Sequence, residues 1–158
     1  MCVNRGLVRK PWKDRYLDVD RTRVHFLEAG RGPILCLVHG ARTWECAELT
    51  YGSAINHLSK QMHVIAPDTI GWGLTQARGP EDFIAHTQGD FLIQFFNKLG
   101  IENASFVGLS HGGFLVQHIA HKAPKLVRNL ILVNSHSGTK PYPPTQEELD
   151  YIDGLRKM

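Results

Sequence analysis

The sequence predicts an α/β fold in which helices cover both faces of a mostly parallel sheet. Three observations support this prediction: short apolar runs recur along the chain, segments with helical spacing lie between them, and glycine turns follow several of the runs. Strands that alternate with helices are typical of such a sheet. Functional residues in this architecture gather at the carboxyl ends of the strands.

The first half of the chain predicts a hairpin, two further strands and a helix. Residues 15–30, RYLDVDRTRVHFLEAG, predict two strands joined by a turn at Asp20–Arg21. The apolar run ILCLV, which ends at His39–Gly40, predicts a strand buried on both faces. Residues 47–60 predict a helix, and MHVIAPD, 62–68, predicts the next strand.

The second half predicts two more strands and further helices. Residues 81–99 have one apolar face and predict a single helix. ASFVG, 104–108, predicts a short buried strand, and a helix follows Gly113 until Pro124 ends it. VRNLILVNS, 127–135, predicts a fourth buried strand. A capping box, Thr145 with Glu148, predicts the start of another helix.

Composition excludes several functional classes. The net charge is only +3, and the densest basic stretch lies in residues 1–14, which we interpret as an N-terminal arm rather than a nucleic-acid contact. No Cys-x-x-Cys pair predicts a zinc site, and no apolar run is long enough to span a membrane. These features predict a cytoplasmic protein with a small-molecule substrate and without metal, nucleic-acid or membrane partners.

Residues Gly108-Leu109-Ser110-His111-Gly112 fit the G-x-S-x-G pattern of a nucleophile elbow. A strand that turns directly into a helix holds its serine in a strained conformation, and small residues two positions away on each side prevent clashes. The helix directs its amino end at the serine, where negative charge is favoured. The alternative is a glycine-rich turn with an incidental serine. We interpret Ser110 as a nucleophile.

A second stretch supplies the other half of an oxyanion hole. Stabilising a tetrahedral intermediate needs two converging N–H donors. One comes from the residue after the nucleophile, His111, and the other from the loop after the first buried strand, where Ala41 is the candidate. His39, in the same loop, is interpreted as a residue that braces the loop rather than a catalytic base.

Four stretches together resemble the α/β-hydrolase family: VHFLEAGRGPILCLVHG, VIAPDTIGWGLT, LGIENASFVGLSHGGFLVQ and LVRNLILVNS. The resemblance covers about residues 15–136 and implies the amino-terminal portion of the hydrolase core, with the C-terminal strands absent and residues 137–158 starting a cap. It is similar to the branch that cleaves carbon–carbon bonds, and to small esterases. Leu109 departs from the former, which usually has asparagine before the serine.

The family resemblance implies a catalytic triad in the order Ser, Asp or Glu, His, but the strands that carry the acid and the histidine do not follow in this chain. His136 comes after the last predicted strand and is a candidate base, as is His111, although its ring lies unfavourably for Ser110. The chain is therefore interpreted as a fragment of an enzyme, a truncated product, or a binding protein. The apolar strand at 129–134 would then form an open sheet edge, which predicts a homodimer.

The leading hypothesis is a serine hydrolase, without cofactor, acting on a small ester, amide, lactone or C–C bond substrate. The alternative is a non-catalytic binding or scaffold protein, since GGFLVQ and LILVNSHSGT resemble maspardin, a binding member of the family. Epoxide hydrolases and dehalogenases of this family use an aspartate where Ser110 stands, which disfavours those activities.

Overall fold

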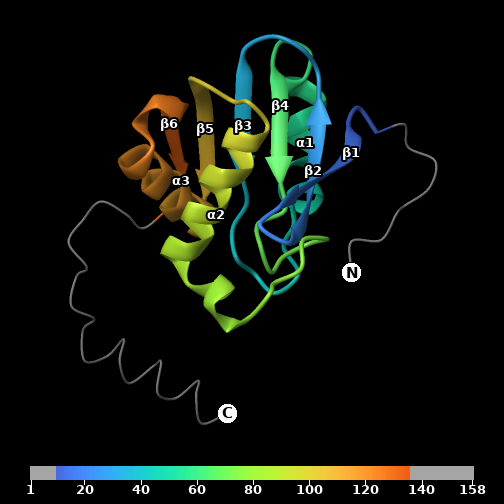
Figure 1. The fold of residues 1–158 in the computed structure, drawn as a ribbon. Coiled ribbons are helices and arrows are strands. Elements are labelled where there is room, and N and C mark those ends of the chain that lie inside the picture. Colours follow the sequence, from blue (N-terminus) through green and yellow to red (C-terminus); the bar gives the residue numbers. More distant parts are fainter. Residues whose placement is uncertain (1–9, 136–158) are drawn as a thin grey trace, which may run out of the picture.

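The computed structural model describes residues 10–135, which form one six-stranded sheet with helices on both faces (Figure 1). The strand order is β1-β2-β4-β3-β5-β6. The strands are β1 (Lys13–Val19), β2 (Thr22–Ala29), β3 (Ile34–Val38), β4 (His63–Pro67), β5 (Ala104–Leu109) and β6 (Val127–Val133). Strands β4, β3, β5 and β6 run parallel, whereas β1 and β2 are antiparallel to their neighbours. The predicted mostly parallel α/β fold is confirmed.

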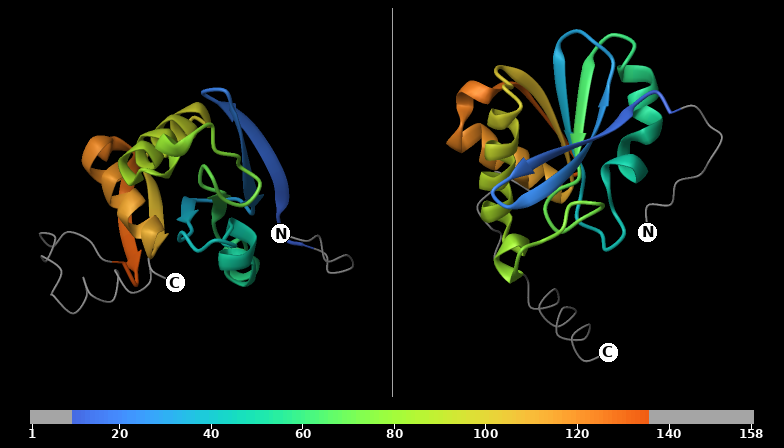
Figure 2. Two further views of the ribbon diagram at one scale, coloured as in Figure 1. Left: turned by 90° about the horizontal axis from the view of Figure 1, so that it is seen from below. Right: turned by 45° about the vertical axis from the view of Figure 1, so that its right-hand side comes forward.

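Three helices cover the sheet: α1 (Ala47–Leu58), α2 (Ala85–Lys98) and α3 (His111–Lys122). Two 3₁₀ turns, η1 (Pro80–Phe83) and η2 (Pro124–Leu126), precede α2 and β6. Helix α1 packs on one face, and α2 and α3 pack on the other (Figure 2). None of the helices in residues 10–135 is long and apolar enough to cross a membrane.

Alternate residues of the central strands form two separate apolar cores. On β3, Cys36 and Val38 join the core beneath α2 and α3, whereas Leu35 and Leu37 join the core beneath α1. Successive side chains of a strand point to opposite faces, so a strand covered on both faces must be apolar throughout. This explains the uninterrupted apolar run from which this strand was predicted.

The hairpin at the start of the described chain turns as the sequence predicts. Asp20 and Arg21 both have positive φ, 40° and 65°, the combination that a tight two-residue hairpin turn requires. Strand β1 begins at Lys13, two residues before the predicted boundary of the core at residue 15. The structure thus assigns the end of the predicted arm to the sheet.

The single helix predicted over residues 81–99 is wrong in one respect, because the segment divides into η1 and α2 at Ile84. This residue is extended, with ψ of 125°. The buried carboxylate of Asp82 accepts hydrogen bonds from the backbone N–H and the guanidinium of Arg78. These bonds hold η1 against the preceding loop, so the α-helix starts only at Ala85. Periodicity within 81–99 could not reveal this constraint.

Strand β6 lies at the edge of the sheet and is exposed, as expected for an open edge at residues 129–134, although its apolar run alone indicated a buried strand. It pairs only with β5 among the described strands. Leu130, Ile131, Leu132 and Val133 are 37–48% exposed. Its apolar run therefore resembles that of a central strand, although nothing within residues 10–135 covers its outer side. The predicted helix near Thr145 and residues 137–158 lie outside the described residues.

Candidate functional site

Ser110 stands at the junction between β5 and α3, at the carboxyl end of the sheet. Its backbone has φ of 51° and ψ of −118°, a region that non-glycine residues rarely adopt. Its N–H donates to Val133 O at 2.9 Å, and its C=O accepts from Gly113 N at 2.9 Å. The side chain is exposed and does not cap α3. The predicted turn therefore presents a free hydroxyl at the amino end of a helix.

Gly108 and Gly112 permit this turn because each approaches another backbone too closely for a side chain. A Cβ at position 108 would lie 2.4 Å from Gly112 O. A Cβ at position 112 would lie 2.2 Å from Val38 O and 2.4 Å from His39 O. The first turn of α3 is thus packed directly on the end of β3. Only glycine satisfies both contacts.

The same packing brings the loop after β3 beside Ser110. Val38 pairs with Gly108, so residues 39–41 and 109–111 leave the sheet at one edge. Ala41 is exposed in this loop, and His111 begins α3. Within residues 10–135, neither the Ala41 N–H nor the His111 N–H donates a hydrogen bond to another residue. Two backbone donors without a partner among residues 10–135 therefore occur in the two segments that leave the sheet at this edge, and the helix dipole favours negative charge at the amino end of α3.

His39 is fully buried and both of its ring nitrogens are occupied. Nδ1 donates to Gly40 O at 2.6 Å, and Nε2 accepts from Thr69 N at 3.0 Å. Burial lowers the pKa of His39, although Gly40 O and the carboxylates of Asp68 and Glu45 oppose this shift, so the ring is neutral. The ring ties the loop after β3 to the loop after β4. It braces the loop and has no nitrogen left for proton transfer.

The ring of His111 is also fixed by hydrogen bonding. Its Nε2 donates to Gln88 Oε1 at 2.6 Å, and Gln88 Nε2 donates in turn to Asp82 O at 2.8 Å. Burial, with a further contribution from His39, lowers the pKa of His111 and keeps it neutral. Because Gln88 is fully buried on α2, this bond directs the ring toward α2. The ring of His111 is therefore held by Gln88, whereas its backbone N–H has no partner among residues 10–135.

Aromatic side chains form a row next to the serine. The centroid of the His111 ring lies 6.4 Å from the ring centroids of both Phe114 and Trp72, and the ring centroids of Trp72 and Phe83 are 5.5 Å apart. Phe114 and Phe83 are exposed, as is Trp44 in the loop before α1. We call Phe83, Trp72, His111 and Phe114 the aromatic row. It provides an apolar surface that begins at His111, the residue after Ser110.

Asp68 anchors the loop that follows β4. Its buried carboxylate accepts from Leu74 N at 2.9 Å and from Ala47 N at 2.8 Å. The sequence did not identify its third partner, His25 Nδ1, at 2.8 Å. The sequence carries only a weak indication of this pair, namely a histidine between a valine and a phenylalanine in a predicted strand. The pair ties β2 to the loop that follows β4.

The Ser110 hydroxyl has no hydrogen-bonded base in the part of the chain that the structure describes. Among residues 10–135, no histidine or carboxylate makes a hydrogen bond to the Ser110 hydroxyl. The other candidate base, His136, lies just outside the described residues. Within those same residues, no three His, Cys, Asp or Glu side chains are grouped so that they could hold a metal ion.

Comparisons with known proteins place these features in context. Residues 33–156 match the family described as alpha/beta hydrolase fold. Haloalkane dehalogenase 2 of Mycobacterium tuberculosis is 27% identical over 125 residues, which cover 79% of this chain and 43% of that protein. For 2-hydroxymuconate semialdehyde hydrolase of a Pseudomonas species, the identity is 30% over 134 residues, which cover 85% of this chain and 46% of that protein. The chain thus spans less than half the length of these curated relatives.

A solved structure agrees with the described fold. The crystal structure of a serine hydrolase involved in carbazole degradation aligns with a TM-score of 0.77 at 25% identity, covering 91% of this chain and 56% of that one. An epoxide hydrolase structure, CorEH without ligand, aligns with a TM-score of 0.78 at 23% identity and 50% coverage of its chain. The shared architecture is therefore that of about half of each of these larger chains.

Proposed function

Because this chain belongs to the α/β-hydrolase fold family, we propose that it carries the nucleophile portion of a serine hydrolase. Ser110 is the nucleophile, and the N–H groups of Ala41 and His111 form the oxyanion hole. One observation carries the proposal: the strained backbone of Ser110, at φ 51° and ψ −118°, holds an exposed hydroxyl at the start of α3. Strain of this kind costs about 1–3 kcal/mol and is retained at functional sites.

The reaction begins when the Ser110 oxygen attacks a carbonyl carbon and loses its proton to a base. Negative charge develops on the carbonyl oxygen, where two backbone donors and the amino end of α3 stabilise it. The base comes from outside residues 10–135, and His136 is the candidate within this chain. The C–X or C–C bond then breaks as the protonated base gives its proton to the leaving group, which leaves an acyl group on Ser110. The same base next takes a proton from water, the water oxygen attacks the acyl carbon, and the carboxylic acid departs as the Ser110 oxygen regains its proton.

The substrate class follows from the surroundings of the serine. The aromatic row begins at His111, the residue after Ser110, and offers apolar contacts to an acyl or aromatic group. We propose a small ester, amide, lactone or C–C bond substrate with an apolar acyl portion, handled in the cytoplasm without a cofactor. The similar proteins include 2-hydroxymuconate semialdehyde hydrolase and haloalkane dehalogenase 2. Serine at position 110 favours the first, because the dehalogenase-type members use aspartate there.

A fluorophosphonate probe tests whether Ser110 is activated. We expect covalent labelling of the wild-type protein and complete loss of labelling in Ser110→Ala. Ser53→Ala, which changes an exposed serine on α1, is the matched control and keeps the label. Labelled peptides are identified by mass spectrometry, and circular dichroism verifies folding. A folded wild-type protein that takes up no label contradicts an activated serine in this chain.

The second candidate is a binding protein that keeps the hydrolase fold. It is favoured by one observation: within residues 10–135, nothing accepts the proton of Ser110. A binding role predicts that small apolar esters raise the melting temperature of wild-type and Ser110→Ala protein alike, without turnover. Absence of labelling together with such a shift selects this candidate over the hydrolase.

We also propose that two copies of the chain pair through β6. Its apolar residues are exposed, and no strand within residues 10–135 pairs with its outer edge. An open edge of this kind pairs with another strand. We expect a dimer by light scattering after size-exclusion chromatography. Ile131→Lys should yield monomer, whereas Leu49→Lys, an equivalent change at an exposed position on α1, should not. A wild-type monomer at high concentration contradicts this proposal.

A further inference from the structure

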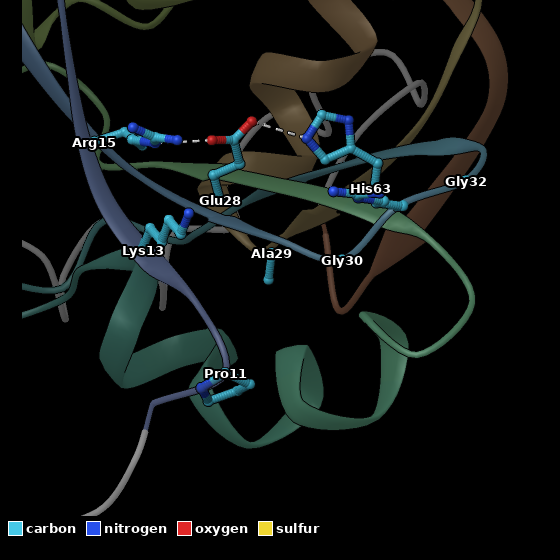
Figure 3. Close-up of a pocket in the computed structure, with 9 residues that line it drawn as sticks. Pro11, Lys13, Arg15, Glu28, Ala29, Gly30, Gly32 and His63 are labelled. Atoms are coloured by element: carbon cyan, nitrogen blue, oxygen red, sulfur yellow. Dashed lines mark hydrogen bonds and ion pairs between the residues drawn. The ribbon is translucent and has the colours of Figure 1, made fainter.

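A polar cavity lies at the end of the sheet opposite to Ser110. It has a volume of about 460 Å³ and is formed by β1, the end of β2, the loop at residues 30–32 and the start of β4 (Figure 3). His63 begins β4, so the cavity lies at the amino ends of the parallel strands, whereas Ser110 follows the carboxyl end of β5. The proposed catalytic site makes no use of it.

The lining of this cavity carries an excess of positive charge. Lys13, Arg15 and Arg31 contribute three permanent cations, and Glu28 contributes the single carboxylate. Arg15 Nε donates to Glu28 Oε2 at 2.9 Å, and His63 Nε2 donates to Glu28 Oε1 at 3.0 Å. Both oxygens of the carboxylate are therefore occupied by groups other than Lys13 and Arg31.

Lys13 and Arg31 remain without an anionic partner in the described part of the chain. Lys13 lies directly across from Glu28 in the β1–β2 register, and its ammonium group points toward the Arg15–Glu28 pair (Figure 3). Exposed cations normally separate in solvent, because like charges that converge repel one another. Here the sheet register and the loop hold them around one cavity.

The loop that carries Arg31 is fixed by its two glycines. Gly30 and Gly32 have positive φ, 74° and 119°. A Cβ at Gly30 would lie 2.2 Å from Met62 O, and a Cβ at Gly32 would lie 2.7 Å from Gln61 O. The loop therefore rests on the backbone before β4, so the backbone that carries Arg31 is already ordered. Binding a ligand through Arg31 then costs the ordering of one side chain and not of the loop.

We propose that this cavity binds a small polyvalent anion, a phosphate ester or a polycarboxylate, through Lys13 and Arg31, with Arg15 as a further contact. Its volume lies within the range typical of small-ligand sites. The surplus of positive charge attracts a ligand with at least two negative charges. Glu28 and His63, which also line the cavity, can form hydrogen bonds with hydroxyl groups of the same ligand.

Calorimetric titration with inorganic pyrophosphate and with citrate, at low salt, tests the proposal. We expect saturable binding of one anion per chain, weakened about tenfold or more in the double variant Lys13→Gln/Arg31→Gln. The double variant Lys98→Gln/Lys122→Gln removes two equally charged, exposed side chains elsewhere and should bind as wild type does. Preference for pyrophosphate identifies a phosphate site, and preference for citrate a polycarboxylate site.

Glu28→Gln provides a second, independent variant. It removes the negative charge and keeps an acceptor for Arg15 and His63, so anion binding should become tighter by several-fold. Ser110→Ala should bind the anion unchanged, which separates this site from the proposed catalytic function. Equal binding by both double variants, or no saturable binding to folded wild-type protein at millimolar anion, overturns the proposal.

Discussion

Asp68→Ala is expected to lower the free energy of unfolding by about 3–5 kcal/mol, the cost of removing one partner from a buried ion pair. The carboxylate is only 2% exposed, and it accepts three hydrogen bonds, from Ala47 N, Leu74 N and His25 Nδ1. Alanine leaves these donors without an acceptor in a dry environment. The loop that it anchors lies next to the aromatic row, so the surface beside Ser110 should loosen as well.

Urea denaturation followed by circular dichroism measures this loss. Asp90→Ala is the matched control, because the Asp90 carboxylate also contacts a histidine, His118, at 2.7 Å, but is 54% exposed. Exposed pairs contribute little, so the control should change stability by less than about 1 kcal/mol. An equal effect of the two substitutions would show that burial of Asp68 does not matter.

The free energy of unfolding should also depend on pH through the His25–Asp68 pair. Burial alone would lower the pKa of His25, but the hydrogen bonds and charges of Asp68 and Asp14 outweigh it and raise this pKa above 6.5. Burial would raise the pKa of Asp68, but His25 and two backbone N–H groups outweigh it and lower this pKa below 3.8. The stabilisation that protonated His25 contributes to the free energy of unfolding is therefore complete below pH 6.5. It is lost as the pH rises through the pKa of His25 in the folded protein.

The stabilisation that ionised Asp68 contributes to the free energy of unfolding depends on pH in the opposite direction. It is complete above pH 3.8 and is lost as pH falls through the lowered folded pKa. The stability difference between wild type and Asp68→Asn should thus be largest between about pH 4 and 6.5, and should decrease at alkaline pH as His25 loses its proton. A difference that is constant from pH 4 to 9 would mean that His25 is neutral throughout.

Much of the fold could be predicted because local patterns determine it. The apolar runs, the Asp20–Arg21 turn and the glycines around Ser110 each act within a few residues. The error over residues 81–99 arises because a side chain, and not the apolar pattern, decides where the helix starts: Asp82 bonds to Arg78, four residues earlier, and the α-helix begins only at Ala85. The apolar run of β6 does not by itself show that the strand is exposed, because exposure follows from its place at the end of the strand order.

The site shows the same division. Gly108-x-Ser110-x-Gly112 identified the turn, and the pairing of Val38 with Gly108 brings the loop of Ala41 to it. The His25–Asp68 pair was missed because its partners are 43 residues apart and belong to no sequence motif. Pairs of this kind follow from strand order, which one sequence does not specify.

Gly112→Ala is expected to lower the free energy of unfolding by about 3 kcal/mol, because it forces an added methyl group against the end of β3. The new Cβ would lie 2.2 Å from Val38 O and 2.4 Å from His39 O, and neither backbone atom can rotate away. Relief requires α3 to move from β3. That movement would separate the N–H of His111 from that of Ala41, so fluorophosphonate labelling of Ser110 should fall even in the folded fraction.

Gly52→Ala is the matched control, since it adds the same methyl group inside α1. There the nearest atom is a ring carbon of Trp12 at 3.2 Å, which a side chain can accommodate, and alanine favours a helix over glycine by about 1 kcal/mol. Stability should stay within about 1 kcal/mol of wild type, with labelling unchanged. If Gly112→Ala behaved in the same way, the start of α3 would not be held against β3, and the two N–H groups would not converge on one oxyanion.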